Sequence, residues 1–528
     1  MISKLATLFH TLSYLRPIQG VYQVMNRVLR VGTLSSFKLT SDSGKKLDFF
    51  SIPSVNQILS VESNLLKFEF LNLRKTFPFD SIDWNDQSHG KLWNYNLQYL
   101  DYLKQEDISL EVKITLVKDL YSWLWNGKLP LEPYPVSLRV MNMIRFLNSD
   151  QLSEDDLAFL RSYIFAEVNY LSQNLEYHIL ANHLLENAFA LWMGATYFGE
   201  KGWLIKAEKL LRSELKEQIL PDGAHYELAP MYHQIILYRV MEAYYLTSED
   251  HSLKSFLKQT GNLMLGWLAQ MSFANGTLPH FNDTTEDIAL PPSELLELGE
   301  SIGLVPEFRE LKDSGYRILQ SADLKLVADV EGIKPSYQPG HAHADTFSFV
   351  LHQGSIPVIV DPGISTYNIS KRRNWERSTV AHNTLTIDRQ NSSQVWSGFR
   401  VGRRAKVKML ADGENFYSAQ HDGFGKQIHN RIFEMTETGF RITDKVRNRR
   451  SEALLEVRFY LHPDVQVRMV DDLCVKLNNQ ISLAFKGASK IGLEDYEFCL
   501  GYNRLKQSKV LLVNIHEDQL VTLITTNQ

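Results

Sequence analysis

The sequence predicts a multidomain α + β protein, in which an N-terminal (α/α) toroid, an incomplete helical barrel, is followed by a C-terminal antiparallel β-sandwich. Three observations predict this arrangement. The chain has 528 residues, whereas single cores stop growing near roughly 250–300 residues. Apolar residues recur at helical spacing between about residues 110 and 310, and at alternating spacing after about residue 315. Short turn sequences separate the segments in both parts, as in stacked antiparallel helices and in hairpins.

Composition excludes several classes of protein. The chain is 44% hydrophobic and 22% charged, which is typical of globular domains rather than of disordered chains. Its net charge of −5 argues against bulk attraction to nucleic acid or to an anionic membrane, so an anionic ligand must be bound by local groups. The sequence contains no run of about 18 apolar residues, so it does not predict a transmembrane helix. The two cysteines are too few for a disulfide scaffold.

Residues 1–65 are predicted to form a partly helical N-terminal extension. Apolar residues in the first 30 positions follow helical spacing, and Arg16, Arg27 and Arg30 interrupt them. A secretory signal peptide would instead have a continuous apolar stretch before a cleavage site. The segment therefore favours a cytoplasmic over a periplasmic location.

The helical toroid is predicted over residues 66–312. Its clearest amphipathic segments have the 3.6-residue period of helices and are separated by Gly, Pro, Asn or Asp. They cover residues 111–127, 153–175, 182–199, 206–220 and 231–246.

The β-sandwich is predicted over residues 313–528. β-Branched runs with a two-residue period and little intervening helix indicate antiparallel strands. The turns at 353–355 and 437–439 fit hairpins. The strand segments lie within residues 324–330, 347–363, 382–388, 403–410, 431–446, 454–462, 464–469, 474–485 and 509–515.

The densest group of chemically active residues lies in the predicted β-domain. GHAHAD contains His341 and His343, VIVDPG contains Asp361, and AHNT contains His382. Two histidines and an aspartate from neighbouring β segments suit a three-ligand zinc site. One histidine of the HAH pair could instead perform acid–base work, and each of these side chains could simply hydrogen-bond its own turn.

A second group lies at the start of a predicted helix. ANHLLEN places Asn182 and Glu186 on one helical face, with His183 at its flank. Asn182 is also a good N-cap residue, and His183 could be a buried core histidine.

A third group follows the Pro-Asp-Gly break at 221–223. Tyr226, Glu227 and Tyr232 lie on the approach to the next helix, where loop-borne side chains suit a binding site. Aromatic packing between helices is the alternative for both tyrosines. In LPHFNDTTED, Asn282 and Asp283 indicate a turn rather than a ligand.

Seven segments in order across both domains resemble the heparinase II/III-like family, whose members include heparan and alginate lyases. They are WNYNLQYLDYL (93–103), NHLLEN (182–187), DGAHYELAPMYH (222–233), LPHFND (278–283), GHAHADTFSFVL (340–351), VIVDPGISTYN (358–368) and RSTVAHNTLTID (377–388). The resemblance implies an (α/α) toroid followed by a β-sandwich, with the active-site cleft between them.

The resemblance also implies roles for individual residues. The catalytic set falls on Asn182, His183, Tyr232 and His341. The ligands of a mainly structural Zn²⁺ fall on His343, Asp361 and His382. The opening YLRPIQGVYQVMNRVL resembles members associated with bacterial surface-polysaccharide synthesis, and this resemblance implies an endogenous polymer as the substrate.

The predicted reaction is β-elimination at a uronic acid of an acidic polysaccharide or oligosaccharide. Asn182 and His183 would hydrogen-bond the carboxylate. Tyr232 would protonate the leaving oxygen, and either His341 or Tyr232 would accept the proton from carbon 5. Substrate contacts are predicted for Arg139, Glu186, Tyr226 and Arg377, the two arginines as anchors for anionic sugars.

Two other functions fit parts of the sequence. A glycoside hydrolase built on the toroid would need two carboxylates across the scissile bond, for which Glu186, Glu227 and Asp283 are candidates. A catalytically silent glycan-binding scaffold would not need Tyr232 and His341 to converge. No nucleic-acid partner is predicted, and the pattern indicates no particular oligomeric state.

Overall fold

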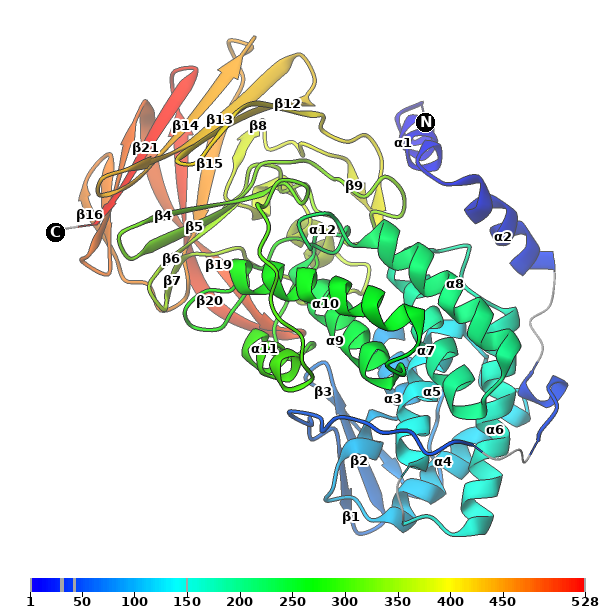
Figure 1. Cartoon of the computed structure of the whole chain (residues 1–528). Coiled ribbons are helices and arrows are strands. Elements are labelled where there is room, and N and C mark those ends of the chain that lie inside the picture. The colour runs from blue at the N-terminus through cyan, green and yellow to red at the C-terminus, as the bar shows by residue number, and fades with distance from the viewer. Residues whose placement is uncertain (1, 29–32, 41–43, 149–150, 527–528) are drawn as a thin grey trace.

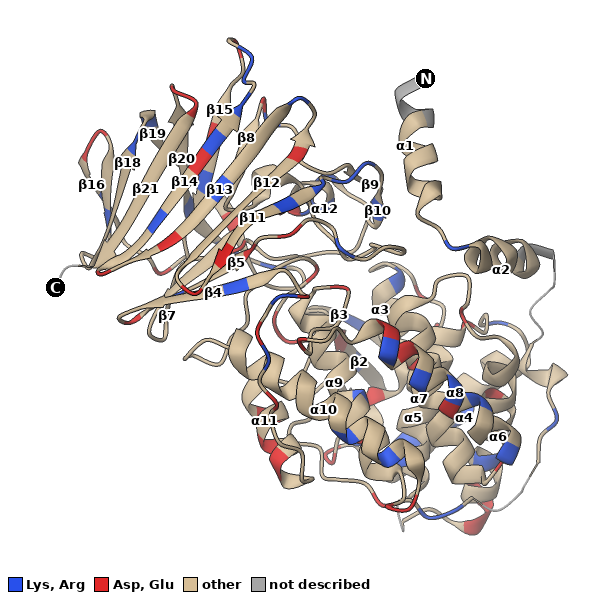
Figure 2. Cartoon of the chain, turned by 45° about the horizontal axis from the view of Figure 1, so that its top comes forward, with Lys and Arg blue, Asp and Glu red and all other residues tan. Residues whose placement is uncertain are grey.

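The computed structural model describes residues 2–28, 33–40, 44–148 and 151–526, with helices in the N-terminal half and antiparallel sheets in the C-terminal half. Figure 1 shows the two halves as adjoining bodies, with the helices below and the sheets above. The predicted order, a helical toroid before a β-sandwich, is confirmed. Lys and Arg are interspersed with Asp and Glu over both halves (Figure 2).

Several helices of the helical domain begin with a recognisable start signal. Ser109 and Ser153 accept the amide hydrogens of Val112 and Asp156 and so cap their helices. Prolines occupy the first turns of three others, where a missing amide hydrogen costs nothing. The helices are α3 (Lys91–Tyr99), α4 (Leu110–Trp125), α5 (Pro133–Leu147), α6 (Glu154–Gln173), α7 (Ala181–Phe198), α8 (Lys201–Gln218), α9 (Pro230–Leu246), α10 (Ser252–Met271) and α11 (Pro292–Ser301).

Helix α7 lies at the centre of this domain. Nearly all of its side chains are buried, and it packs against α5, α6, α8 and α9. A helix that is apolar around most of its circumference is stable only inside a protein. The first turn of α7 is therefore held in place from several sides.

The β-domain contains the predicted strand segments in antiparallel pairs. The turns at 353–355 and 437–439 connect hairpins as expected. Its strands are β4 (Tyr316–Ser321), β5 (Leu324–Asp329), β6 (Phe349–Gln353), β7 (Ile356–Ile359), β8 (Leu385–Ile387), β9 (Val395–Trp396), β10 (Arg400–Val401), β11 (Val407–Gly413), β12 (Phe416–Phe424), β13 (Gln427–Thr436), β14 (Gly439–Arg447), β15 (Leu455–Tyr460), β16 (Val467–Asp471), β17 (Cys474–Leu477), β18 (Ile481–Lys486), β19 (Ala488–Gly501), β20 (Arg504–Ile515) and β21 (Gln519–Thr526).

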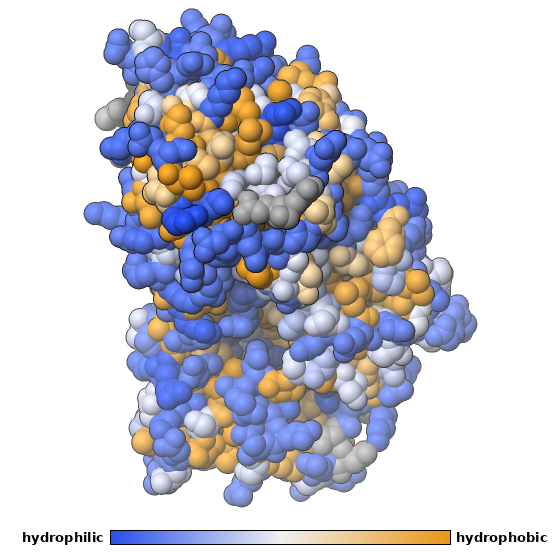
Figure 3. All heavy atoms as spheres, turned by 90° about the vertical axis from the view of Figure 1, so that its left-hand side faces the viewer, coloured by the Kyte–Doolittle hydropathy of each residue, from blue (hydrophilic) through white to orange (hydrophobic). Residues whose placement is uncertain are grey.

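These strands form three main sheets. Their orders are β4-β5-β6-β7, β19-β20-β15-β8 and β11-β12-β13-β14-β21-β18-β17-β16, and β9 pairs with β10 separately. One apolar core contains residues from all three main sheets, which makes the sandwich. Figure 3 shows one face of the molecule, where hydrophilic side chains predominate and apolar ones form separate patches. The long loops between β5 and β6 and between β7 and β8 run toward the helical domain, and the short helix α12 (Lys371–Glu376) lies in the second loop.

A small three-stranded sheet precedes the helices and was not predicted. It consists of β1 (Leu59–Glu62), β2 (Leu65–Phe70) and β3 (Leu73–Pro78) in antiparallel order. Its inward residues Leu66, Phe68 and Phe70 alternate with partly exposed or exposed ones, which is the ordinary strand period. The sheet crosses the predicted boundary between residues 65 and 66.

Two further helices, α1 (Ile2–Ser13) and α2 (Pro17–Val28), run along the outside of both domains. Arg16 pairs with Glu217 at 2.7 Å, and Thr11 accepts a hydrogen bond from the Trp396 indole. The predicted partly helical extension thus contacts the helical domain and the β-domain. None of the described helices has the length and apolar character that a bilayer crossing requires.

Candidate active site

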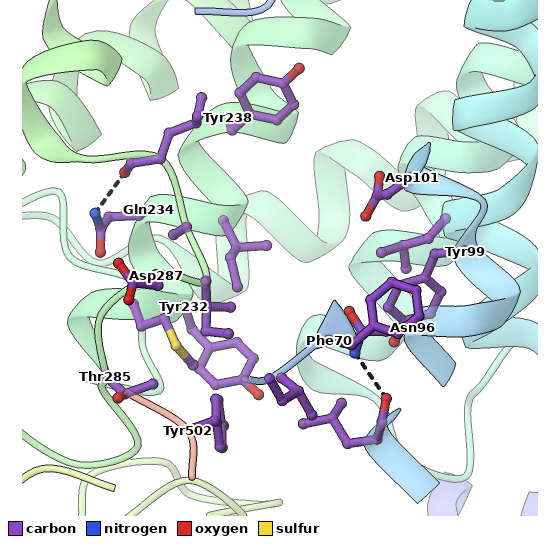
Figure 4. A pocket seen from close by; sticks show the side chains of 18 of the residues that line it. Phe70, Asn96, Tyr99, Asp101, Tyr232, Gln234, Tyr238, Thr285, Asp287 and Tyr502 are labelled. Atoms are coloured by element: carbon purple, nitrogen blue, oxygen red, sulfur yellow. Dashed lines mark hydrogen bonds between the residues drawn. The ribbon is translucent and has the colours of Figure 1, made fainter. Parts of the chain in front are cut away.

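A cavity of about 1090 Å³ lies where the two domains meet. The helical domain contributes side chains from α3, α5, α7 and α9, and the β-domain contributes loop residues that include His341, Tyr367, Phe399 and Tyr502. Figure 4 shows Tyr232 and Tyr502 on one side of this space and Phe70, Tyr99 and Asp101 on the other. All four residues of the predicted catalytic set line the cavity.

Tyr232 and His341 lie against each other although they belong to different domains. Their ring centroids are 3.9 Å apart, with the ring planes inclined by 30°. The Tyr232 hydroxyl is 3.1 Å from that of Tyr367, which is itself 3.4 Å from Nδ1 of His341. Burial raises the pKa of Tyr232 well above its ordinary value, so its hydroxyl stays protonated at neutral pH.

Asp283 fixes the position of His341. One carboxylate oxygen of Asp283 lies 2.9 Å from His341 Nδ1, and the other lies 2.8 Å from Nε2 of His343. Arg373 binds both oxygens, at 2.5 and 2.7 Å. Burial opposes ionisation, but Arg373 and the two histidines hold the pKa of Asp283 well below its ordinary value. The segment predicted as a simple turn is therefore the anchor of the histidine loop.

Backbone hydrogen bonds join the same two loops. The Asp283 amide donates to the carbonyl of His341 at 3.1 Å, and the His343 amide donates to the Asn282 side chain at 2.9 Å. Asn282 has a φ of 54°, in the left-handed region that asparagine tolerates better than most residues. His341 and His343 thus lie in a loop rather than a strand, and they face opposite oxygens of one carboxylate.

Asn182 and His183 occupy the first turn of α7. Leu180 and Ala181 reach this turn with positive φ values of 65° and 55°, a conformation that costs free energy for residues with a Cβ. Leu180, not Asn182, is the N-cap, so the alternative of Asn182 as an N-cap is wrong. His183 Nδ1 lies 3.1 Å from a Glu176 oxygen. Burial lowers the pKa of His183, but Glu176, Glu227 and Glu186 together raise it by more, so the net shift is upward.

Glu227 lies between the two halves of the catalytic set. One of its oxygens accepts the Asn182 amide hydrogen at 3.2 Å, and the other is 3.6 Å from Nε2 of His341. Burial raises the pKa of Glu227 above its ordinary value.

None of the four predicted substrate contacts lines the cavity. Arg139 is buried in the helical core, where its Nε lies 2.8 Å from Glu167, so an anchoring role does not fit this place. Glu186 is buried and bonded to Arg239 at 3.1 Å. Tyr226 packs on the ring of Tyr337 at 5.7 Å.

Arg377, the fourth of these residues, lies beneath the histidine loop. It donates from Nη2 to the carbonyl of Ala342 at 2.8 Å, and its own carbonyl accepts the Ala344 amide hydrogen at 2.9 Å. Burial lowers the pKa of Arg377 to about 9. Its contacts position the backbone between His341 and His343, and it does not reach the cavity.

The predicted zinc ligands gather in one buried region next to the cavity. The rings of His343 and His382 are 5.3 Å apart, and His382 Nδ1 lies 2.7 Å from Asp361. The second ring nitrogen of each histidine is buried without a hydrogen-bond partner. Within the described ranges, however, no group of three His, Cys, Asp or Glu side chains has the arrangement of a metal site.

Arg373 and Tyr367 were not predicted as site residues, and Asp283 was considered only as a turn residue or as a carboxylate of the alternative hydrolase. Tyr367 belongs to VIVDPGISTYN, one of the segments that carried the resemblance, and Asp283 belongs to another, so position within these segments was an available signal. Arg373 lies in α12, between two such segments, and no pattern marked it.

Comparison with known proteins agrees with this architecture. The family model described as "Heparinase II/III N-terminus" matches residues 67–290. The family model described as "Heparinase II/III-like, C-terminal" matches residues 304–526. The chain belongs to the heparinase II/III-like family. The predicted resemblance is therefore confirmed.

Curated relatives of this heparinase II/III-like chain include heparin-sulfate lyases of Pedobacter heparinus and Bacteroides stercoris. The first is 28% identical over 58% of this chain and 49% of the relative, and the second is 23% identical over 59% and 52%. The chain spans about half the length of these relatives. A crystal structure of heparinase III matches with a TM-score of 0.68 at 16% identity, covering 84% of this chain and 79% of that one, which shows a shared fold.

Proposed function

We propose that this protein is a carbon–oxygen lyase that cleaves a uronate-containing acidic polysaccharide by β-elimination. The observation that carries the proposal is the contact between Tyr232 and His341, at a ring distance of 3.9 Å, in a cavity that Asn182 and His183 also line. These residues come from three separate segments of two domains. The names of the heparin-sulfate lyase relatives support the same reaction class.

Elimination requires that the uronate carboxylate be stabilised as carbon 5 loses its proton. Asn182 and His183 lie in the first turn of α7, where the helix dipole also favours negative charge and where Glu227 already accepts the Asn182 amide hydrogen. Preorganised donors of this kind stabilise the charge that develops in the transition state.

Proton transfers are assigned to His341 and Tyr232. In the tautomer in which Nδ1 of His341 donates its hydrogen to Asp283, the ring lone pair is on Nε2, and this nitrogen accepts the carbon 5 proton. The Tyr232 hydroxyl donates its proton to the departing oxygen on carbon 4, which suits a phenol that burial keeps protonated.

The glycoside hydrolase is less well supported by the geometry. Both oxygens of Asp283 are engaged by Arg373. Glu186 does not line the cavity and is bonded to Arg239. Of the three candidate carboxylates only Glu227 lines the cavity, whereas hydrolysis needs two across the bond.

Purified protein mixed with uronate-containing polymers tests the proposal. Elimination creates a conjugated carbon–carbon double bond, so ultraviolet absorbance of the product should increase with time. Reducing ends that appear without this absorbance would indicate hydrolysis, and binding without cleavage would indicate the scaffold. A role in bacterial surface-polysaccharide metabolism and a cytoplasmic location stay predictions.

A structural Zn²⁺ is a second proposal, with His343 and His382 as its nitrogen ligands. The unpartnered, buried ring nitrogens of both residues support it. Asp361, the third predicted ligand, is turned toward His382 and would have to share its carboxylate with the metal. Bound zinc would stabilise the loops around the cavity.

Elemental analysis of chelator-free protein should find about one zinc per chain, and chelation should lower the melting temperature. His382→Ala should lose both the metal and the response to chelator, whereas His516→Ala, an exposed control, should keep both. Absence of stoichiometric metal would contradict this proposal without affecting the assignment of His341 and Tyr232.

A further inference from the structure

The charges that line the cavity restrict which acidic polymers can enter it. Among the described residues, the lining contains three lysines or arginines, Lys91, Lys104 and Arg239. It contains twice as many carboxylates, namely Glu69, Asp101, Glu227, Glu286, Asp287 and Glu294. Three of these carboxylates have partners outside the lining, since Glu69 pairs with Arg74, Glu286 with His280 and Asp287 with Arg504. The lining therefore offers a polyanion no lysine or arginine in excess over its carboxylates.

Each of the three cations already has a carboxylate partner. Lys91 lies 2.8 Å from Glu132, and Lys104 lies 2.6 Å from Asp101. A sulfate group that drew either lysine away would leave an uncompensated carboxylate next to the sulfate. The local charge would be unfavourable even though exposed ion pairs are individually weak.

Arg239 is held more firmly than the lysines. Its Nε lies 3.1 Å from Glu186 and its Nη1 lies 3.1 Å from Glu242, both carboxylates being buried. Glu242 also binds Arg145 at 2.8 Å. Removing Arg239 from this network to bind a ligand would leave buried charge without a partner, which is strongly unfavourable.

The rest of the lining suits uncharged sugar faces. Its aromatic side chains come from both domains and combine flat apolar surfaces with hydroxyl groups. They include Tyr95, Tyr99, Tyr134, Tyr238, Tyr502 and Phe399. In the first turn of α7 a helix N-terminus, the Asn182 side chain and His183 lie together in the lining, and these groups favour an anion.

We propose that the substrate is a polymer whose only anionic groups are uronate carboxylates, without sulfate. This inference rests on the proposed elimination reaction and narrows its substrate. The proposed substrate differs from the sulfated polymer that the names of the heparin-sulfate lyase relatives give for those proteins. Specificity would come from repulsion of the additional charges as well as from attraction of one carboxylate.

The inference can be tested with pairs of polymers that share a backbone and differ in sulfation. One pair is an unsulfated heparan-type polymer and its sulfated counterpart, and the second pair is unsulfated and sulfated chondroitin. In at least one pair we expect kcat/KM for elimination to be at least tenfold higher on the unsulfated member. Equal or faster cleavage of the sulfated member would overturn the inference while leaving the lyase assignment intact. Absence of elimination on every uronate polymer would instead contradict the proposed function.

Binding supplies a measurement that does not depend on chemistry. Tyr232→Phe protein should bind unsulfated uronate oligosaccharides from at least one of these backbones, or from a polyuronate, more tightly than sulfated ones of equal length in calorimetry. Added salt should reduce the difference, because it screens repulsion between charges. Tighter binding of sulfated oligosaccharides, or no binding of any unsulfated one, would contradict the inference.

A single charge change should relax the specificity. Glu132→Gln removes the carboxylate partner of Lys91 and keeps an acceptor for the Tyr95 hydroxyl. We expect a roughly fivefold gain in affinity for sulfated oligosaccharides, the effect of one unit charge at contact distance in water. Glu111→Gln, an exposed change on α4 away from the lining, is the control and should show no gain. The same small gain in both variants would show that the lining charges do not set specificity.

Discussion

The two walls of the cavity are built in different ways. On the helical side, Asn182, His183 and Tyr232 lie on α7 and α9, whose backbones are fixed by their own hydrogen bonds and by packing. On the β side, His341 and Tyr367 lie in loops that are fixed by buried side-chain contacts, chiefly those of Asp283 with Arg373. A single substitution should therefore act locally on the helical wall and disturb several residues on the loop wall.

Arg373→Met should have the largest effect. It leaves the Asp283 carboxylate buried without its bidentate partner, which typically costs about 3–5 kcal/mol. Both stability and activity should fall, because His341 loses its anchor. Denaturant unfolding measures the first effect and product absorbance the second. Arg74→Met, which breaks an exposed pair with Glu69, is the control and should cost roughly 0–1 kcal/mol. Equal stability of the two variants would mean that the loop wall does not depend on this ion pair.

His341→Ala should affect the reaction more than the fold. Asp283 keeps Arg373 and His343 as partners, so the free energy of unfolding should change much less than in Arg373→Met. Loss of a general base typically reduces kcat by about 10²–10⁴-fold. Steady-state kinetics and a melting curve should be measured together, with the exposed His516→Ala as control. A variant that keeps kcat within a few-fold of the original would remove His341 from the mechanism.

Asn182→Ala tests the helical wall and should have a smaller effect. The side chain is buried at the first turn of α7, and its loss removes one donor to the uronate carboxylate. We expect kcat to fall about 10²–10³-fold with little change in stability. The exposed Asn126→Ala should change neither quantity. If Asn182→Ala changed only KM, the side chain would contribute to binding in general and not to the transition state.

The sequence predicted the helical wall better than the loop wall. A 3.6-residue period is visible along α7 and α9, so the relative positions of residues on these helices follow from spacing. β1–β3 was missed because its strands are short and precede the strongly helical segments. Domain order followed from the change of period near residue 315, which requires no knowledge of contacts.

The contacts of the loop wall could not be obtained in this way. Asp283 and Arg373 are 90 positions apart and meet only in the folded protein. Arg139 and Arg377 illustrate the opposite error, since a sequence does not show whether a guanidinium faces a cavity or a buried partner. Arg139 is bonded to Glu167, and Arg377 to the carbonyl of Ala342.

Tyr232→Phe tests the central claim most directly, because the Tyr232 hydroxyl belongs to the helical wall and contacts Tyr367 of the loop wall. The substitution keeps the ring against His341 and removes only the hydroxyl that would protonate the leaving oxygen. On a uronate polymer that the unchanged protein cleaves, we expect the ultraviolet signal of the unsaturated product to fall at least about 10²-fold. The melting temperature should stay within a few degrees of the original. Near-normal product formation by the folded variant would contradict the assignment of Tyr232 and, with it, the proposed elimination mechanism.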